Sequence, residues 1–144
     1  MTSRRLLVLL AIAVPLLSAC INDGASFQIE GKEHSISFLR EQKWFWDPQV
    51  RLAVVATRMP ECQRRHHLDP APVKQAAVEV WRTGSTTFIL KQADKLYLVE
   101  TQTCEGFRKL GEPPPGGLGE RMGAFTDEGG ALRFVVQGGV AAGK

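Results

Sequence analysis

The residues best suited to chemistry lie in one short run, Cys62-Gln63-Arg64-Arg65-His66-His67-Leu68-Asp69, which combines a thiol, two imidazoles and a carboxylate. Thiolate and imidazole groups bind zinc and copper, and Cys104 could supply a second sulfur ligand. Two arginines would, however, place fixed positive charges beside a cation, and adjacent histidines on an extended chain point to opposite faces. We therefore predict no metal site. The run is interpreted as a solvated basic loop, and the alternative is that Arg64, Arg65, His66 and His67 bind an anion such as a lipid phosphate, a polysaccharide or an acidic partner.

A second run, Lys43-Trp44-Phe45-Trp46-Asp47, holds two of the three tryptophans of the chain. Tryptophans two positions apart on a strand share one face, and burial in the core is the preferred interpretation because tryptophan is bulky and well buried on average. If Trp44 and Trp46 were exposed, they would form a platform for a sugar or a partner protein, or would enter a membrane interface.

Motifs of catalysis are missing from the sequence. It contains no Gly-x-Ser-x-Gly nucleophile elbow, no His-Glu-x-x-His zinc motif, no glycine-rich phosphate loop and no Cys-x-x-Cys redox pair. We therefore predict a protein that is not an enzyme and that needs no cofactor.

The N-terminus has the pattern of a secretion signal. Arg4 and Arg5 precede a twelve-residue apolar run at 6–17, too short to span a bilayer, and Leu17-Ser18-Ala19-Cys20 closes it. This segment resembles the lipobox of bacterial lipoproteins, over residues 1–20 only. The resemblance implies that the Cys20 thiol carries a diacylglycerol, that the signal peptide 1–19 is removed, and that the new N-terminus is acylated. By the same resemblance, Ile21 in place of an aspartate points to the outer membrane of a two-membrane host.

Removal of the signal peptide changes the charge of the chain. It takes away two of the 18 Lys and Arg residues, so 16 remain against 15 acidic residues and the formal net charge falls from +3 to +1. A nearly neutral domain does not attract nucleic acid, and no nucleic-acid partner is expected. We predict a short membrane tether at 20–26, a single β-rich domain at 27–137 and a disordered Gly/Ala-rich tail at 138–144.

Period-two alternation and β-branched runs dominate the mature chain and predict an all-β fold. Three hairpins are expected, with turns at 30–33, 93–95 and 128–130, and a helical turn could follow Pro72. The prediction is a small antiparallel sandwich or barrel of about seven or eight short strands.

Cysteine parity predicts one disulfide. If Cys20 carries a lipid, Cys62 and Cys104 remain as a pair in an oxidising compartment. Their bond would close a loop of about 43 residues, worth roughly 3 to 4 kcal/mol in the chain-entropy model.

These features together predict a lipid-anchored envelope protein at the periplasmic face of the outer membrane that acts as a non-catalytic binding or assembly module. An envelope protein or an anionic envelope component would be its partner, contacted through an exposed strand edge or the Trp44/Trp46 face. The alternative is a lipoprotein that binds a small ligand, an anion or a metal through the Arg64-Arg65-His66-His67 run, with His34 as a further candidate. A redox role of Cys62 and Cys104 ranks third.

Overall fold

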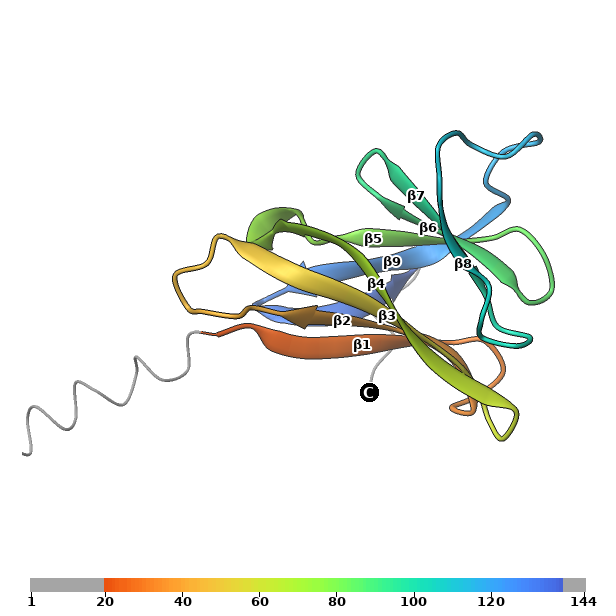
Figure 1. The fold of residues 1–144 in the computed structure, drawn as a ribbon, viewed down its shortest axis with the longest axis horizontal. Helices are drawn as coiled ribbons and strands as arrows, with labels where there is room; N and C mark the ends of the chain where they lie inside the picture. The colour runs from red at the N-terminus through yellow and green to blue at the C-terminus, as the bar shows by residue number, and fades with distance from the viewer. Residues whose placement is uncertain (1–19, 139–144) are drawn as a thin grey trace, which may run out of the picture.

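Ten β-strands and one 3-10 turn form the regular structure of residues 20–138, the residues that the computed structural model describes. In chain order they are β1 (Asn22–Gln28), β2 (His34–Glu41), β3 (Gln49–Arg58), β4 (Cys62–Pro72), η2 (Val73–Gln75), β5 (Val78–Arg82), β6 (Thr87–Gln92), β7 (Lys95–Glu100), β8 (Phe107–Leu110), β9 (Glu120–Glu128) and β10 (Ala131–Val136). They make two antiparallel sheets, ordered β1-β2-β3-β4 and β10-β9-β5-β6-β7-β8, that pack as a sandwich (Figure 1). The all-β prediction is confirmed. The predicted signal peptide at 1–19 and residues 139–144 of the predicted tail lie outside the described residues.

The three predicted hairpins are all present. β1 pairs with β2 and places Phe27 opposite Ile36, β6 pairs with β7, and β9 pairs with β10. The β9–β10 turn uses Gly129 and Gly130, whose φ angles of 67° and 89° lie in the left-handed region that glycine adopts without steric cost. The turn η2 follows Pro72, where a helical turn was also expected.

Three strands differ from the prediction, and all three lie at sheet edges. Residues 22–26, predicted as a tether, belong to β1, residues 62–69, predicted as a basic loop, belong to β4, and β8 was not expected. The strands therefore number ten rather than seven or eight within the described residues. An edge strand has only one neighbouring strand, so its sequence can be polar and lacks the apolar alternation by which a central strand is identified.

The core lies between the two sheets and is rich in aromatic rings. Phe38 of β2 packs on Phe125 of β9 with ring centroids 5.4 Å apart, and Phe27 of β1 packs on Phe134 of β10 at 4.7 Å. All four rings are buried. The remaining core side chains are mostly β-branched or leucine and come from both sheets: Ile36, Val50, Leu52, Val54, Val78, Val80, Leu90 and Val99.

The predicted disulfide is confirmed. Cys62 at the start of β4 bonds to Cys104, which follows β7, so the bond joins the edge of one sheet to the other sheet. Cys104 is fully buried and contributes to the core. The bond closes the sandwich on the side where β4 and β8 are the edge strands.

Candidate functional site

The four residues of the predicted anion site lie on β4, where alternation divides them between two faces. Arg64 and His66 lie opposite Ala56 and Val54 of β3, which belong to the core, so their side chains share the inward face of the sheet. Arg65 and His67 therefore point to the opposite, outer face. A single loop that gathers all four side chains, as the sequence suggested, is not formed.

His66 connects the two sheets. Its Nε2 donates to the carbonyl oxygen of Cys104 at 2.8 Å, and its ring stacks on Phe107 of β8 with centroids 4.7 Å apart. Phe107 in turn stacks on Tyr97 at 5.8 Å. The contacts of His66 are those of a structural side chain beside the disulfide.

The two arginines of the run have separate acidic partners. Arg64 lies 3.8 Å from Glu105, and Arg65 lies 3.8 Å from Glu41, which also pairs with Arg51 at 2.7 Å. His34 is buried elsewhere, with its ring nitrogens 3.1 Å from Glu30 and 2.8 Å from the hydroxyl of Thr101. Within residues 20–138 no three His, Cys, Asp or Glu side chains come together as a metal-binding group.

The Trp44/Trp46 pair is exposed, which corrects the preferred prediction of burial. Residues 43–46, called the aromatic loop below, lie within the β2–β3 connection at 42–48. Trp44, Phe45 and Trp46 in this loop are 50%, 54% and 64% exposed. The Trp44 and Trp46 rings stack on each other with centroids 5.4 Å apart, and Phe45 packs edge-on against Trp46 at 4.6 Å. The three rings pack on one another in a turn outside both sheets. They are therefore not part of the core.

The aromatic loop lies beside the start of β1. Gln42 donates its backbone N–H to the carbonyl of Ile21 at 2.7 Å, and its side-chain oxygen accepts from the N–H of Ile21 at 3.2 Å. The side-chain amide of Gln42 also donates to the carbonyl of Asp47 at 2.6 Å. Gln42 therefore holds together the residue after Cys20 and both ends of the loop, and Cys20 itself is exposed. Figure 1 shows both segments at the same end of the sandwich.

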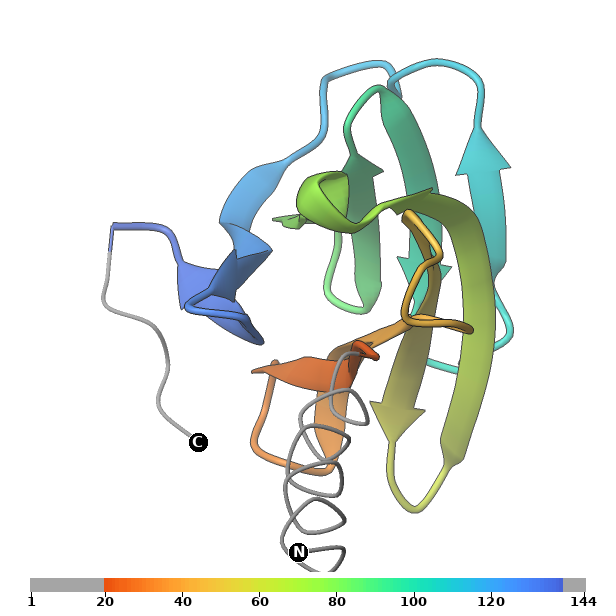
Figure 2. The ribbon, with the colours of Figure 1, turned by 90° about the vertical axis from the view of Figure 1, so that its left-hand side faces the viewer.

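A groove lies between β1 and β10, two edge strands of different sheets that run side by side (Figure 2). Its volume is about 610 Å³, and its lining includes the buried rings of Phe27 and Phe134. Lys32 and Arg133 also line it, and both are exposed. Among the described strands, β1 is hydrogen-bonded to β2 alone and β10 to β9 alone.

The register fixes which backbone groups of β1 face away from β2. Gln42 donates its N–H to Ile21, and Ile29 donates to His34, so the odd-numbered residues of β1 form the hydrogen-bonded pairs with β2. The N–H and C=O groups of Gly24 and Ser26 therefore point away from β2, at the side where these residues line the groove. The edge of β1 offers hydrogen-bonding groups to an added strand.

The edge of β10 is oriented in the same way. Gln137 donates its N–H to Met122, so odd-numbered residues of this strand form the hydrogen-bonded pairs with β9. The backbone groups of Leu132, Phe134 and Val136, which line the groove, therefore point away from β9. One of them is already used, because the Leu132 N–H donates to a carboxylate oxygen of Asp23 at 2.9 Å.

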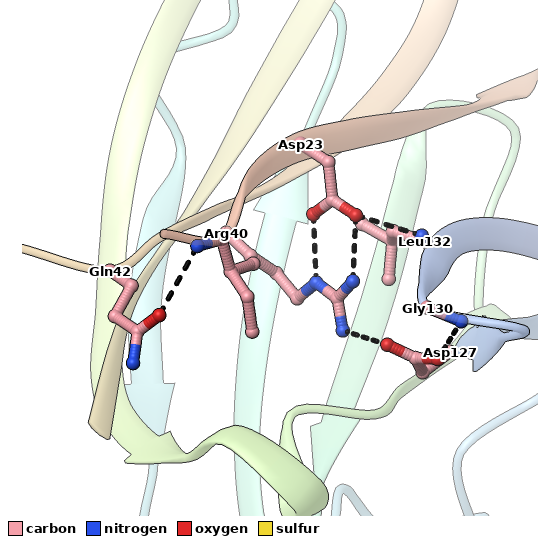
Figure 3. A network of polar contacts seen from close by, with 7 residues as sticks. Asp23, Arg40, Gln42, Asp127, Gly130 and Leu132 are labelled. Carbon is pink, nitrogen blue, oxygen red and sulfur yellow. Dashed lines mark hydrogen bonds and ion pairs between the residues drawn. The ribbon is translucent and has the colours of Figure 1, made fainter. Parts of the chain in front are cut away.

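A buried arginine joins the two sheets at the end of the groove where β1 begins (Figure 3). Arg40 of β2 is 1% exposed and donates two hydrogen bonds to Asp23, at 2.7 and 2.8 Å, and one to Asp127 at 2.9 Å. The hydrogen bonds from Arg40 hold the pKa values of Asp23 and Asp127 below their ordinary range, and those bonds raise the pKa of Arg40. All three side chains are ionised at neutral pH and form a satisfied network.

Comparison of the chain with protein-family models, with curated proteins and with solved structures finds no match. Among residues 20–138 no helix is long and apolar enough to cross a bilayer.

The groove and the Arg40 network were not identified from the sequence. A signal for Arg40 exists, because β2 alternates inward side chains at His34, Ile36 and Phe38, and Arg40 occupies the next inward position. A charged residue at an inward position predicts a buried ion pair. No comparable signal exists for the groove, which depends on which two sheet edges meet.

Proposed function

We propose that this protein is an envelope lipoprotein, anchored by a lipid on Cys20 at the periplasmic face of the outer membrane, that binds an extended segment of another envelope protein without catalysis. The observation that carries the binding role is the groove between β1 and β10. Its two strand edges present unpaired backbone groups beside an apolar floor, the combination by which sheets bind extended peptides.

The lining of the groove indicates the chemistry of the bound segment. The rings of Phe27 and Phe134 favour an apolar side chain at every second position, because alternate residues of a strand point to the same side. Lys32 and Arg133 favour acidic residues between or beside the apolar ones. We therefore propose a guest strand of alternating apolar and acidic character.

The alternative site in the run 64–67 has less support. Arg64 and His66 share a face with the core and contact Glu105, Phe107 and the Cys104 carbonyl, whereas Arg65 and His67 lie on the other face. A ligand of small size cannot contact all four. We accordingly place the binding role in the groove.

Lipidation of Cys20 is tested with labelled palmitate in cells. We expect the wild-type protein to incorporate the label and Cys20→Ser to lose it completely, because this thiol is the only cysteine outside the disulfide. The Cys62→Ser/Cys104→Ser variant is the matched control and should keep the label. An unlabelled wild-type protein, or a labelled Cys20→Ser variant, would show that the anchor is wrongly assigned.

Strand addition is tested at Ser26, whose backbone N–H points away from β2 into the groove. We expect Ser26→Pro to reduce capture of a cross-linked envelope partner by about tenfold, because proline removes one edge donor and leaves the β1–β2 ladder intact. The partner is quantified by mass spectrometry after cross-linking in solubilised envelopes.

Two matched variants separate this effect from general damage. Ser26→Ala removes only the side-chain contact with Ser37, and Asn22→Pro places a proline on the same edge but outside the groove lining. Both should capture the partner as the wild type does. Equal capture by Ser26→Pro in a variant of normal stability would refute strand addition in the groove.

A further inference from the structure

We propose that the aromatic loop is a membrane-contact surface whose three rings enter the headgroup region of the bilayer that holds Cys20. This inference rests on the proposed function, because the lipid on Cys20 is what places the loop at a membrane. It goes further in assigning a second contact with the bilayer and a fixed orientation of the domain.

The lipid anchor on Cys20 and the aromatic loop lie close together because hydrogen bonds join the residue after Cys20 to the residue before the loop. Only Ile21 separates Cys20 from β1, and Ile21 is hydrogen-bonded to Gln42 through both its N–H and its C=O. Gln42 precedes the loop directly and donates to the carbonyl of Asp47 at its far end. A lipid on Cys20 therefore brings residues 43–46 to the membrane surface, with no flexible segment in between.

The side chains of the loop suit an interface between water and hydrocarbon. Trp44, Phe45 and Trp46 are each at least half exposed, and three adjacent exposed aromatic residues are unusual on a surface that faces only water. Tryptophan is enriched at membrane interfaces because its ring is apolar and its N–H is polar. The stacked Trp44 and Trp46 rings form one apolar unit, with Phe45 against its side.

The charged groups around the loop also fit a lipid surface. Lys43 lies 5.9 Å from the centre of the Trp44 ring and is exposed, so its ammonium group can pair with a lipid phosphate while the ring is inserted. Lys74 is exposed in the turn η2, and its neighbour Val73 donates its N–H to Pro48 beside the loop. The carboxylate of Asp47 is turned back to accept from the N–H of Gln49 at 2.9 Å.

The orientation that follows leaves the groove accessible. β1 begins at the membrane end, and the groove lining extends along it from Gly24 to Gln28, away from Cys20. With both the lipid on Cys20 and the aromatic loop in the bilayer, the end of the domain where β1 begins faces the membrane. The β1–β10 edge then runs away from the membrane surface. A partner segment can then reach the groove from the periplasm.

The experiment uses the purified lipidated protein reconstituted in vesicles of phosphatidylethanolamine and phosphatidylglycerol. Part of the lipid is brominated, either close to the headgroup or near the chain end, because bromine quenches tryptophan fluorescence on contact. The variant Trp81→Phe leaves only the loop tryptophans, and Trp44→Phe/Trp46→Phe leaves only Trp81 of β5 as a matched control.

We expect the Trp81→Phe protein to lose roughly half its fluorescence with lipid brominated near the headgroup and less with lipid brominated near the chain end, because interfacial rings lie at headgroup depth. The Trp44→Phe/Trp46→Phe protein should lose none. A loop that instead binds a partner protein would stay unquenched in pure lipid vesicles, and that result overturns the inference.

The mass of the reconstituted protein separates the two proposals. A lipidated protein whose loop tryptophans are unquenched contradicts the membrane contact alone. A protein without lipid on Cys20 contradicts the anchor, and the membrane contact that depends on it is then overturned as well.

Discussion

Replacement of both Cys62 and Cys104 by serine will lower the free energy of unfolding by about 4 kcal/mol, the chain-entropy value for a loop that spans a sequence separation of 42 residues. This is a large part of the 5 to 15 kcal/mol that typically stabilises a domain. The bond joins the edge strand β4 to the segment after β7, so its loss also frees the two sheets at that edge. Urea unfolding of the variant and the parent measures the difference.

Two comparisons make this prediction specific. Reduction of the wild-type protein should also lower the free energy of unfolding, by somewhat less than the double substitution, because both remove the same constraint and serine in addition buries a hydroxyl at the core position of Cys104. The His66–Phe107 stack lies beside the bond, so amide hydrogen exchange in β4 and β8 should increase more than in β9 and β10. A loss below about 1 kcal/mol would contradict the entropic account.

The elements predicted correctly from the sequence are those whose local pattern and tertiary role agree. β9 and β10 alternate apolar side chains around a Gly129-Gly130 turn. The two strands pair as an antiparallel hairpin in which Glu128 lies opposite Ala131, on either side of that turn. The disulfide was predicted by parity, since lipidation of Cys20 would leave two thiols for one bond. Each of these predictions needs only neighbouring residues or a count.

The errors occur where tertiary context outweighs the local pattern. β4 was assigned as a loop because charged and polar residues fill its first half, yet it pairs with β3 along Cys62–Pro72. Trp44 and Trp46 were assigned to the core from the average burial of tryptophan, but they stack on each other in a turn outside the sheets. Backbone pairing and mutual ring contact are not visible in composition.

The groove is a case in which no sequence pattern could have been sufficient. It exists because β1 and β10, about a hundred residues apart in the chain, form neighbouring edges of different sheets. Alternation predicts that each is a strand, and pairing rules do not determine which edges meet. A prediction of the binding surface therefore requires the topology first.

The ion-pair network of Arg40 leads to the second large effect. Asp23→Asn will lower the free energy of unfolding by about 3 kcal/mol, because it leaves the guanidinium of a 1% exposed arginine without its main partner. The same substitution replaces the oxygen that accepts the N–H of Leu132 and so weakens the contact between β1 and β10. Urea unfolding at pH 7 provides the measurement.

Arg40→Met is the matched variant, and it should lower the free energy of unfolding by less than Asp23→Asn does. Methionine fills much of the same space without a charge, and the two freed carboxylates, 28% and 45% exposed in Asp23 and Asp127, can be solvated. In the double variant Asp23→Asn/Arg40→Met, no buried cation remains unpaired. The free energy of unfolding should therefore fall by less than the sum of the decreases in the two single variants. Additive losses would indicate that the pair makes no specific contribution.

The pH dependence of stability provides an independent test of the same network. Arg40 lowers the folded-state pKa values of Asp23 and Asp127. The contribution of the two carboxylates to the free energy of unfolding is therefore complete above their unfolded-state pKa of about 4. It disappears as the pH falls through the lower folded-state pKa values. The wild-type protein should therefore lose more stability than Arg40→Met when the pH is lowered from 6 to about 2. The pKa of Asp69 is also lowered, by hydrogen bonds from Lys109 and Lys95, but this contribution is common to both proteins and cancels in the difference. Equal acid sensitivity would mean that Arg40 does not hold the two carboxylates in their charged form.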